Sequence, residues 1–271
     1  MASKSTDADS KRQHNHSDVI FNEDCITGMQ RLPSNIVDLV ITDPPFGIEF
    51  KAKRPNYNRV PHRVLDGYSE VSSRNYLEFT NSWLTEIHRV LKPTGSAFVF
   101  SGWNNLKDIL NALSDVGLET INHIIWKYQF GVVTKRKFVT SHYHCLFVAK
   151  DDKRRTFRAN SRFSQEDRTD SGKSARYQDM EDVWVINREY WTGDIKTPTK
   201  LPRRLIEKIL DYASIEGELV MDPFLGSGQV AVVAQERNRR YLGFEVVPEY
   251  YEFASKRLRT KSYRIPDKNS K

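Results

Sequence analysis

The sequence predicts an α/β domain built on a doubly wound, mostly parallel sheet with helices on both faces. Short apolar runs alternate with amphipathic helical patterns along most of the chain, and two of the runs end in an aspartate followed by a turn rich in proline and glycine. The length of 271 residues, with 38% hydrophobic residues, is enough for one large buried core. Strands that end in this way present a carboxylate at the rim of a sheet.

The first half of the chain predicts strand, helix and strand in succession. "VDLVITD" has the length and composition of a buried strand. The helix that follows is predicted by apolar residues three or four positions apart and ends at "KPTG"; these residues are Tyr76, Phe79, Trp83, Ile87 and Val90. Strand "SAFVF", helix "NLKDILNALSDVG" and strands "TINHIIW" and "HCLFVAK" come next. This order predicts crossover units of a parallel sheet.

The second half resumes the alternation after a polar stretch, 151–182, which we interpret as a loop, an insertion or a small recognition subdomain. "PRRLIEKILDYAS" predicts a helix with a proline in its first turn and with Leu205, Ile209 and Tyr212 on one face. Strand "ELVMDPF", helix "QVAVVAQERN" and strand "YLGFEV" complete the predicted sheet.

Composition limits the classes of protein. No run of about 18 apolar residues occurs, and the polar N-terminal segment lacks the apolar core of a secretory signal, so we expect an intracellular, cytoplasmic protein, associated with the nucleoid if the source is prokaryotic. The net charge of +7 suits a polyanionic partner but is common in other proteins. Cys25 and Cys145 predict buried thiols, and segments 1–17 and 261–271 predict disordered tails.

The second aspartate turn, "DPFLGSGQVA", has the form of a nucleoside-binding loop. Gly226, Gly228 and Ala231 satisfy G-x-G-x-x-A: the first glycine permits a tight turn, the second lets a ligand approach the main chain, and the alanine allows close helix packing. Glu245, at the end of the next strand, can accept hydrogen bonds from ribose hydroxyls. Asp222 would repel a pyrophosphate but suits an ammonium and a sulfonium, which predicts S-adenosylmethionine. The alternative is a tight turn without a ligand.

The first aspartate turn, "DPPF", can activate an amino group of a nucleobase. Hydrogen bonds to the carboxylate of Asp43 and the carbonyl of Pro44 favour a pyramidal nitrogen whose lone pair faces the methyl donor. The two prolines fix successive φ angles, and Phe46 can stack on the base. The alternative is a rigid turn that only ends a strand.

With both turns in one chain, the sequence resembles the DNA amino-methyltransferases, which methylate the exocyclic nitrogen of adenine or cytosine. The resemblance runs from "DVIFNEDCITGMQ" to "GFEVVPEYYEFASKRL", and the position of "DPPF" before "DPFLGSG" resembles the beta class of that family. It implies a Rossmann-like fold with a seven-stranded sheet and S-adenosylmethionine as cofactor. The catalytic residues that it implies are Asp43, Pro44, Pro45 and Phe46, and the cofactor contacts are Asp24, Asp222, Phe224, Gly226, Gly228 and Glu245.

A further segment, "TPTKLP", resembles the family motif "HPTQKP" near the methionine end of the cofactor. Thr197 replaces the usual histidine, and Leu201 replaces the usual lysine while Lys200 lies one place earlier. Only Thr199 and Lys200 are therefore carried over as cofactor contacts.

Chemistry on an amine inside a duplex requires that the base be flipped out, so DNA contacts should surround the first turn. Within a catalytic domain spanning 18–260, we expect a mobile DNA-contacting loop at 48–75 and a target-recognition insertion at 151–195. The predicted contacts with double-stranded DNA are Lys51, Lys53, Arg54, Arg59, Lys135, Arg136, Lys137, Arg154, Arg155 and Arg158, although any single arginine is more often only solvated. The two histidines of "HYHC" share a strand face without a carboxylate cluster, so no metal is expected.

Among members of the family, aspartate before the two prolines is usual for adenine and serine for cytosine, so Asp43 favours adenine-N6 over cytosine-N4. Two rival interpretations stay open: a catalytically silent DNA-binding protein with the same fold, and a methyltransferase acting on RNA or a protein amine. By analogy with the family, a homodimer and a cognate restriction endonuclease of a restriction-modification system are further expectations.

Overall fold

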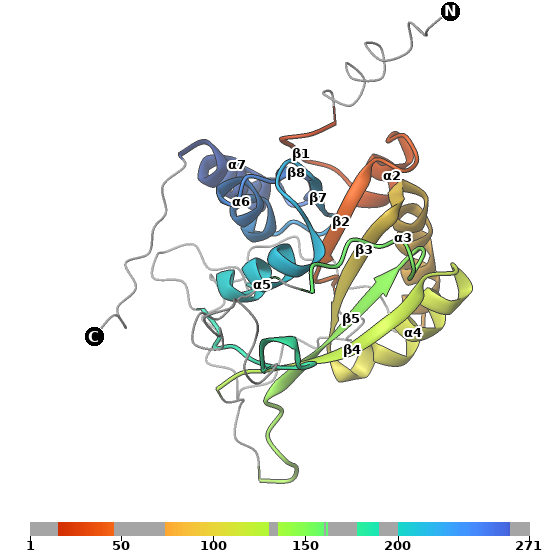
Figure 1. The fold of residues 1–271 in the computed structure, drawn as a ribbon, viewed down its shortest axis with the longest axis vertical. Helices are drawn as coiled ribbons and strands as arrows, with labels where there is room; N and C mark the ends of the chain where they lie inside the picture. Colours follow the sequence, from red (N-terminus) through yellow and green to blue (C-terminus); the bar gives the residue numbers. More distant parts are fainter. Residues whose placement is uncertain are drawn as a thin grey trace, which may run out of the picture.

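The computed structural model describes residues 16–45, 74–129, 135–159, 161, 178–189 and 200–260. Its centre is an eight-stranded sheet with the order β1-β8-β7-β2-β3-β5-β4-β6 (Figure 1). The strands are β1 Val19–Phe21, β2 Val37–Thr42, β3 Leu91–Ser101, β4 Glu119–Lys127, β5 His142–Ala149, β6 Val183–Val185, β7 Leu219–Asp222 and β8 Arg240–Phe244. The predicted α/β class is confirmed, with one strand more than the seven that the resemblance implied.

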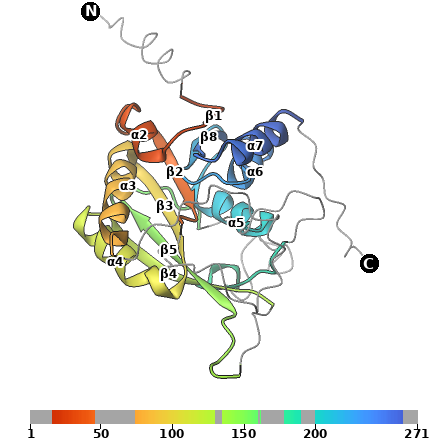
Figure 2. The same cartoon turned by 180° about the vertical axis from the view of Figure 1, so that it is seen from behind.

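Helices cover both faces of the sheet (Figure 1 and Figure 2). One layer contains α2 Cys25–Gln30, α3 Tyr76–Val90 and α4 Leu106–Asp115; the other contains α5 Arg203–Ala213, α6 Gln229–Glu236 and α7 Pro248–Thr260. Short 3₁₀ turns lie at Trp103–Asn105 (η2) and Gln178–Met180 (η3). Because side chains alternate along β2, Val40 packs into the core beneath α3 while Leu39 and Ile41 pack into the core beneath α5 and α6. A strand buried on both faces explains the unbroken apolar run in the sequence.

Strand directions define the two edges of the sheet. From β1 to β3 all neighbouring strands are parallel; β5 is antiparallel to both β3 and β4, and β6 is parallel to β4. We call the edge at which β2, β3, β7 and β8 end the carboxyl edge and the other the amino edge. It follows that β4 and β6 also end at the carboxyl edge, whereas β5 begins there.

The structure extends and corrects the predicted elements in a few places. Helix α7 and the short elements β1, α2 and β6 were not predicted; β6 buries only its central Trp184, so its pattern is too short to recognise. "KPTG" does not separate α3 from the following strand, because β3 begins at Leu91, directly after α3. Val37 of β2 pairs with Leu91, and the register then shifts before Leu39 pairs with Ser96.

Both cysteines are free and buried, as predicted. Burial raises the pKa of each thiol well above its ordinary value, which keeps both protonated at neutral pH. Among the residues that the structure describes, no helix is long and apolar enough to cross a membrane.

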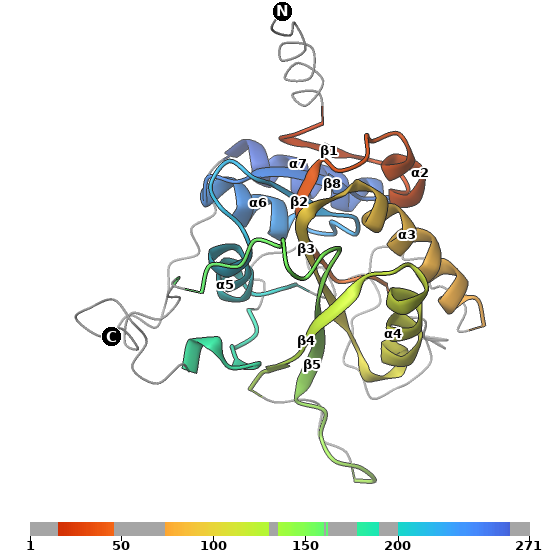
Figure 3. The same ribbon diagram turned by 45° about the vertical axis from the view of Figure 1, so that its right-hand side comes forward.

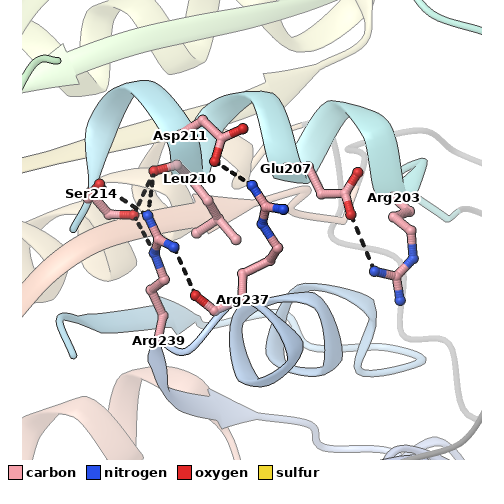
Figure 4. A network of polar contacts seen from close by, with 7 residues as sticks. All are labelled: Arg203, Glu207, Leu210, Asp211, Ser214, Arg237 and Arg239. Carbon is pink, nitrogen blue, oxygen red and sulfur yellow. Dashed lines mark hydrogen bonds and ion pairs between the residues drawn. The ribbon is translucent and has the colours of Figure 1, made fainter. Parts of the chain in front are cut away.

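At the amino edge, two arginines fasten α5 to the start of β8 (Figure 4). The guanidinium of Arg239 donates hydrogen bonds to the carbonyl oxygens of Leu210 and Ser214, at the C-terminal end of α5. Arg237 forms an ion pair with Asp211, with 2.5 Å between nitrogen and oxygen. The hydrogen bonds of Arg239 add donors to carbonyls at the C-terminal end of α5, and together with the ion pair they fix α5 relative to β8, the strand that Glu245 follows.

Candidate active site

The two aspartate turns lie side by side at the carboxyl edge. Strands β2 and β7 are parallel neighbours, with Leu39 opposite Val220 and Val40 opposite Met221. Asp222 is the last residue of β7, and Asp43 directly follows β2. Since neighbouring strands are about 4.8 Å apart, the two carboxylates emerge from adjacent positions on one rim. The two turns therefore lie next to each other on one rim of the sheet.

Asp43 is a half-buried residue whose carboxylate has one buried oxygen that lacks a donor. Its Oδ1 atom is inaccessible to solvent and has no hydrogen-bond partner within the described part of the chain. Burial raises the pKa of Asp43 to about 7, opposed by the positive charge of Arg188. Pro44, the next residue, is also buried. A buried acceptor without a partner is costly, so this geometry fits a ligand that brings its own N–H donor.

Asp222, in contrast, has a hydrogen-bond donor within its own turn. Its Oδ1 accepts a hydrogen bond of 3.1 Å from the backbone N–H of Phe224, and only 5% of the residue is exposed. Burial raises the pKa of Asp222 to about 7, and the nearby carboxylates of Asp43 and Glu245 add to the effect. Three carboxylates gathered at one edge make a site that favours a cation.

The glycine loop has two positions with left-handed backbone. At Gly226 φ is +52°, and a Cβ atom there would meet nothing closer than 4.0 Å, so this position leaves room for a ligand beside the main chain. At Gly228 φ is +75°, and a Cβ atom would lie 2.7 Å from Cβ of Ala254 on α7. The sequence assigned the close approach of a ligand to Gly228; in the structure the missing side chain of Gly228 instead allows α7 to pack.

Glu245 joins the loop to the end of β8. Its Oε2 accepts from the backbone N–H of Gly226 at 2.7 Å and its Oε1 from Val247 at 2.8 Å. Burial raises the pKa of this carboxyl, while hydrogen bonds from backbone donors act against the change. Each oxygen retains a second lone pair that can accept from a ribose hydroxyl. The Phe224 ring, packed edge-on against Trp83 with centroids 5.6 Å apart, adds an apolar wall, so these residues fit a nucleoside.

Asp24 and Lys200, two further predicted cofactor contacts, are engaged with protein groups. Asp24 caps α2 by accepting from the backbone N–H of Thr27 at 2.9 Å, and it follows β1 at the carboxyl edge. The ammonium of Lys200 pairs with Glu189 at 2.9 Å, and the same carboxylate accepts from the backbone of Arg203 at the start of α5. Their cofactor contacts stay predictions. Thr199 and Phe46 lie outside the described residues.

Arg188 is a site residue that the sequence did not reveal. Strand β6 carries the chain to the carboxyl edge, where the guanidinium of Arg188 lies 3.7 Å from the ring centroid of Tyr128 and 5.6 Å from that of Tyr143. Arg188 is also the cation that lowers the pKa of Asp43, which is far away in the sequence. No local pattern connects the two, because only the sheet brings β6 and β2 to the same edge.

The comparisons with known proteins agree with this geometry. The family model described as DNA methylase, of the N6/N4 type, matches residues 37–256, which include both turns. The chain belongs to this family. The type II methyltransferase M.HpaI of Haemophilus parainfluenzae is 30% identical over 86% of this chain and 71% of its own. M2.DpnII of Streptococcus pneumoniae, also a type II methyltransferase, is 28% identical over 89% of each chain.

Solved structures share the fold of this DNA methylase. PvuII DNA methyltransferase, described as cytosine-N4-specific, has a TM-score of 0.67 and 19% identity, covering 88% of this chain and 85% of the other. A DNA modification methylase of Thermus thermophilus, TTHA0409, complexed with S-adenosyl-L-methionine, has a TM-score of 0.64 and 22% identity, covering 89% and 93%. The predicted DNA amino-methyltransferase and its cofactor, S-adenosylmethionine, are confirmed at the level of the family.

The predicted DNA contacts of the methylase fall into two places. Lys135, Arg136 and Lys137 are exposed and lie between the end of β4 and the start of β5, at the carboxyl edge. The other described contacts, Arg154, Arg155 and Arg158, follow β5 and therefore lie at the amino edge; next to them, the backbone N–H of Thr156 donates to the carbonyl of Thr94.

Two of the three arginines at the amino edge have side-chain contacts within the protein. Arg154 pairs with Asp151, and the guanidinium of Arg155 lies 5.7 Å from the ring centroid of Phe147. The structure does not bring them to the aspartate turns, so their DNA contact remains a prediction that their position does not favour. Lys51, Lys53, Arg54 and Arg59 lie outside the described residues, as do most of the expected loop at 48–75 and residues 162–177 and 190–195 of the expected insertion.

Proposed function

We propose that this DNA methylase transfers a methyl group from S-adenosylmethionine to the exocyclic N6 amino group of adenine, in duplex DNA from which the adenine is flipped out. One observation carries the proposal: a cofactor turn and a "DPP" turn end adjacent parallel strands at the same edge. A cation bound beside Asp222 and a base bound beside Asp43 are then within reach of one another.

Asp43 and Pro44 orient the amino group. A carboxylate whose Oδ1 lacks a donor accepts one amino hydrogen, and the carbonyl oxygen of Pro44 accepts the other, which directs the nitrogen lone pair away from the ring plane. The nitrogen becomes cationic when it gains the methyl group, and the carboxylate of Asp43, which already accepts from this amino group, can accept the proton that it then loses. Pro44 and Pro45 hold these acceptors in place before the base arrives.

The cofactor residues position the methyl donor. When bound, S-adenosylmethionine supplies an electrophilic methyl group on a sulfonium. Glu245 binds the ribose hydroxyls, Phe224 contacts the adenine ring, and Asp222 attracts the positive charges of the methionine end. The open side of Gly226 leaves space for the ligand against the main chain.

Adenine is preferred over cytosine because the first turn begins with aspartate, as is usual for adenine in this family. The likeness to the cytosine-N4-specific PvuII enzyme concerns the fold, at 19% identity. Both bases present an amino group to the same pair of acceptors. Only the identity of the methylated nucleoside can therefore distinguish adenine from cytosine as the target.

Nucleoside mass spectrometry of DNA from cells that express the protein tests the proposal. We expect 6-methyladenine with the unaltered chain and none with Asp43→Ala. Asp115→Ala, which removes an exposed carboxylate at the end of α4, is the matched control and should leave the product unchanged.

Three results would contradict the proposal. 4-Methylcytosine in place of 6-methyladenine would assign the enzyme to cytosine. Absence of any methylated nucleoside, together with no heat of S-adenosylmethionine binding in calorimetry, would support a silent DNA-binding protein, and incorporation of labelled methyl groups only into RNA or protein would change the substrate class.

A further inference from the structure

Phe138 is the most exposed large apolar side chain in the described part of the chain, at 99%. A single exposed hydrophobic residue is ordinary in a soluble protein. Phe138 differs in its surroundings, because it directly follows Lys135, Arg136 and Lys137, all of them exposed. An aromatic ring next to three cations is the composition of a surface that binds nucleic acid through both phosphates and bases.

The segment that carries Phe138 is supported by two paired strands. Strands β4 and β5 are paired from Glu119 and Ala149 to Lys127 and His142, and residues 135–141 lead away from the ends of these strands (Figure 3). Beyond the last pair, the backbone N–H of Tyr128 donates to the carbonyl of Ser141 at 3.0 Å.

Packing of aromatic rings reinforces this support. The rings of Tyr128 and Tyr143 lie 6.0 Å apart between centroids, with Arg188 stacked on the former. A support that is ordered before binding reduces the entropy lost when the projecting residues engage a partner.

The segment that carries Phe138 leaves the sheet at the same edge as Asp43. Strand β4 ends, and β5 begins, at the carboxyl edge that carries Asp43. An adenine that reaches Asp43 leaves a hole in the duplex facing this edge. Proteins that distort DNA often insert an apolar side chain between bases, and the unstacking that this requires is offset by contacts with the inserted ring.

We propose that Phe138 enters the duplex and stacks on the bases next to the extruded adenine, while Lys135, Arg136 and Lys137 hold the flanking phosphates. The inference rests on the proposed function, because it requires a DNA duplex and a base that leaves it. It assigns to Phe138 a positioning role, without contact to the reacting atoms.

The test uses the duplex sequence found by mapping methylated sites in cellular DNA. Methylation is measured with the full-length protein on this duplex and on a duplex with an abasic site opposite the target base. Phe138→Ala is compared with Phe138→Trp and with Phe157→Ala, a control that removes a partly exposed ring at the amino edge. Affinity for S-adenosylmethionine shows that each variant is folded.

We expect Phe138→Ala to lower kcat/KM on the intact duplex by about 10- to 100-fold, as for the loss of one stacked base contact. Phe138→Trp and Phe157→Ala should stay within about threefold of the unaltered protein, since the first retains a stacking ring and the second is remote. On the abasic duplex, where extrusion costs less, the deficit of Phe138→Ala should shrink to less than about threefold.

The salt dependence of DNA binding distinguishes the contribution of the Phe138 ring from that of the three cations. The slope of log Kd against log salt concentration should be unchanged in Phe138→Ala and smaller by up to about 3 in the triple variant with glutamine at 135, 136 and 137. Full activity of Phe138→Ala on the intact duplex, or an equal deficit on both duplexes, would overturn the inference while leaving the methylase activity established. An unaltered protein that methylates no DNA would instead defeat the proposed function.

Discussion

The two aspartate turns begin alike but are completed differently. Around Asp222, the contacts come from the same strand–loop–helix unit and the next strand: the N–H of Phe224 donates to Asp222, and the N–H of Gly226 donates to Glu245. Around Asp43, no described donor reaches Oδ1, and the nearby cation, Arg188, comes from the far end of the polar insertion. The carboxylates of the second turn accept backbone donors, whereas one oxygen of the first has no donor in the described part of the chain.

This difference separates ligand binding from chemistry. A loop whose carboxylates already accept backbone donors is ordered before its ligand arrives, which favours affinity. A buried carboxylate without a donor destabilises the free protein and gains a partner only in the complex, which favours catalysis. The following predictions test this contrast, beginning with the largest effect.

Substitution of Asp43 and substitution of Asp222 should affect different steps. Asp43→Asn should lower the methylation rate by about 100- to 1,000-fold while S-adenosylmethionine binds within about threefold of normal, because a catalytic acceptor is lost but the cofactor site is intact. Asp222→Asn should weaken cofactor binding itself by at least about tenfold. Calorimetry and single-turnover methylation measure the two effects, and equal loss of cofactor affinity in both variants would contradict the division of roles.

The two glycines of the loop should also differ. Gly228→Ala forces a Cβ atom against Ala254 in a left-handed conformation and should lower the free energy of unfolding by about 2–4 kcal/mol. Gly226→Ala has open space and should cost about 1 kcal/mol in stability, yet weaken S-adenosylmethionine binding by blocking the ligand side.

Gly217→Ala is the matched control for both glycine variants, since φ is +83° there and nothing lies within 4 Å of the added carbon. Urea denaturation and calorimetry measure the changes. A Gly228→Ala protein as stable as Gly217→Ala would show that packing against α7 is not the reason for glycine.

Ionisation of Asp43 should cost stability. Burial raises its pKa from the ordinary 3.8 to about 7, so the folded state binds more protons than the unfolded state between these values. The protonated carboxyl of Asp43 therefore contributes its full stabilisation of the folded state below about pH 4, and this contribution is lost as the pH rises through 7. Asp43→Asn, which cannot ionise, should therefore raise the free energy of unfolding by about 1–3 kcal/mol at pH 8 relative to the unaltered protein, and by much less at pH 4.5.

Urea denaturation of the cofactor-free protein at the two pH values checks this prediction. Asp222 shifts in the same direction and remains in both proteins, but the charge of Asp43 contributes to its raised pKa, so the difference reports on Asp43 together with its coupling to Asp222. Asp115→Asn, an exposed substitution, should change stability by less than about 0.5 kcal/mol. If Asp43→Asn and the unaltered protein have the same free energy of unfolding at pH 8, then ionisation of Asp43 does not destabilise the folded state.

Arg188 should have the smallest effect, and it should depend on pH. Its removal takes away the positive charge that lowers the pKa of Asp43, so Arg188→Gln should move the acidic limb of the kcat/KM profile to higher pH. We expect a loss of about three- to tenfold at pH 6.5 and less at pH 8.5, with Arg188→Lys intermediate. A uniform loss at every pH would indicate a DNA contact or a structural role.

Much of this site is local in sequence and was therefore predictable. A strand that ends in Asp-Pro-Pro, and another that continues into a loop with glycine at 226 and 228, carry their geometry in the residues themselves, because proline fixes φ and glycine permits positive φ. The apolar runs predicted β2, β7 and β8, and helical spacing predicted α3 and α5. The short strand β6 and the partnership between Arg188 and Asp43 have no such local signal.

The sequence by itself determined the fold class, the two turns and the family, since each depends on residue types at fixed spacing. Tertiary structure alone decided which charged residues share an edge with Asp43. Strand β5 runs antiparallel to β3, so residues that follow it, such as Arg155, lie at the amino edge, while β6 brings Arg188 to the carboxyl edge. The physical reason is that strand direction is set by pairing between distant segments, which no local pattern records.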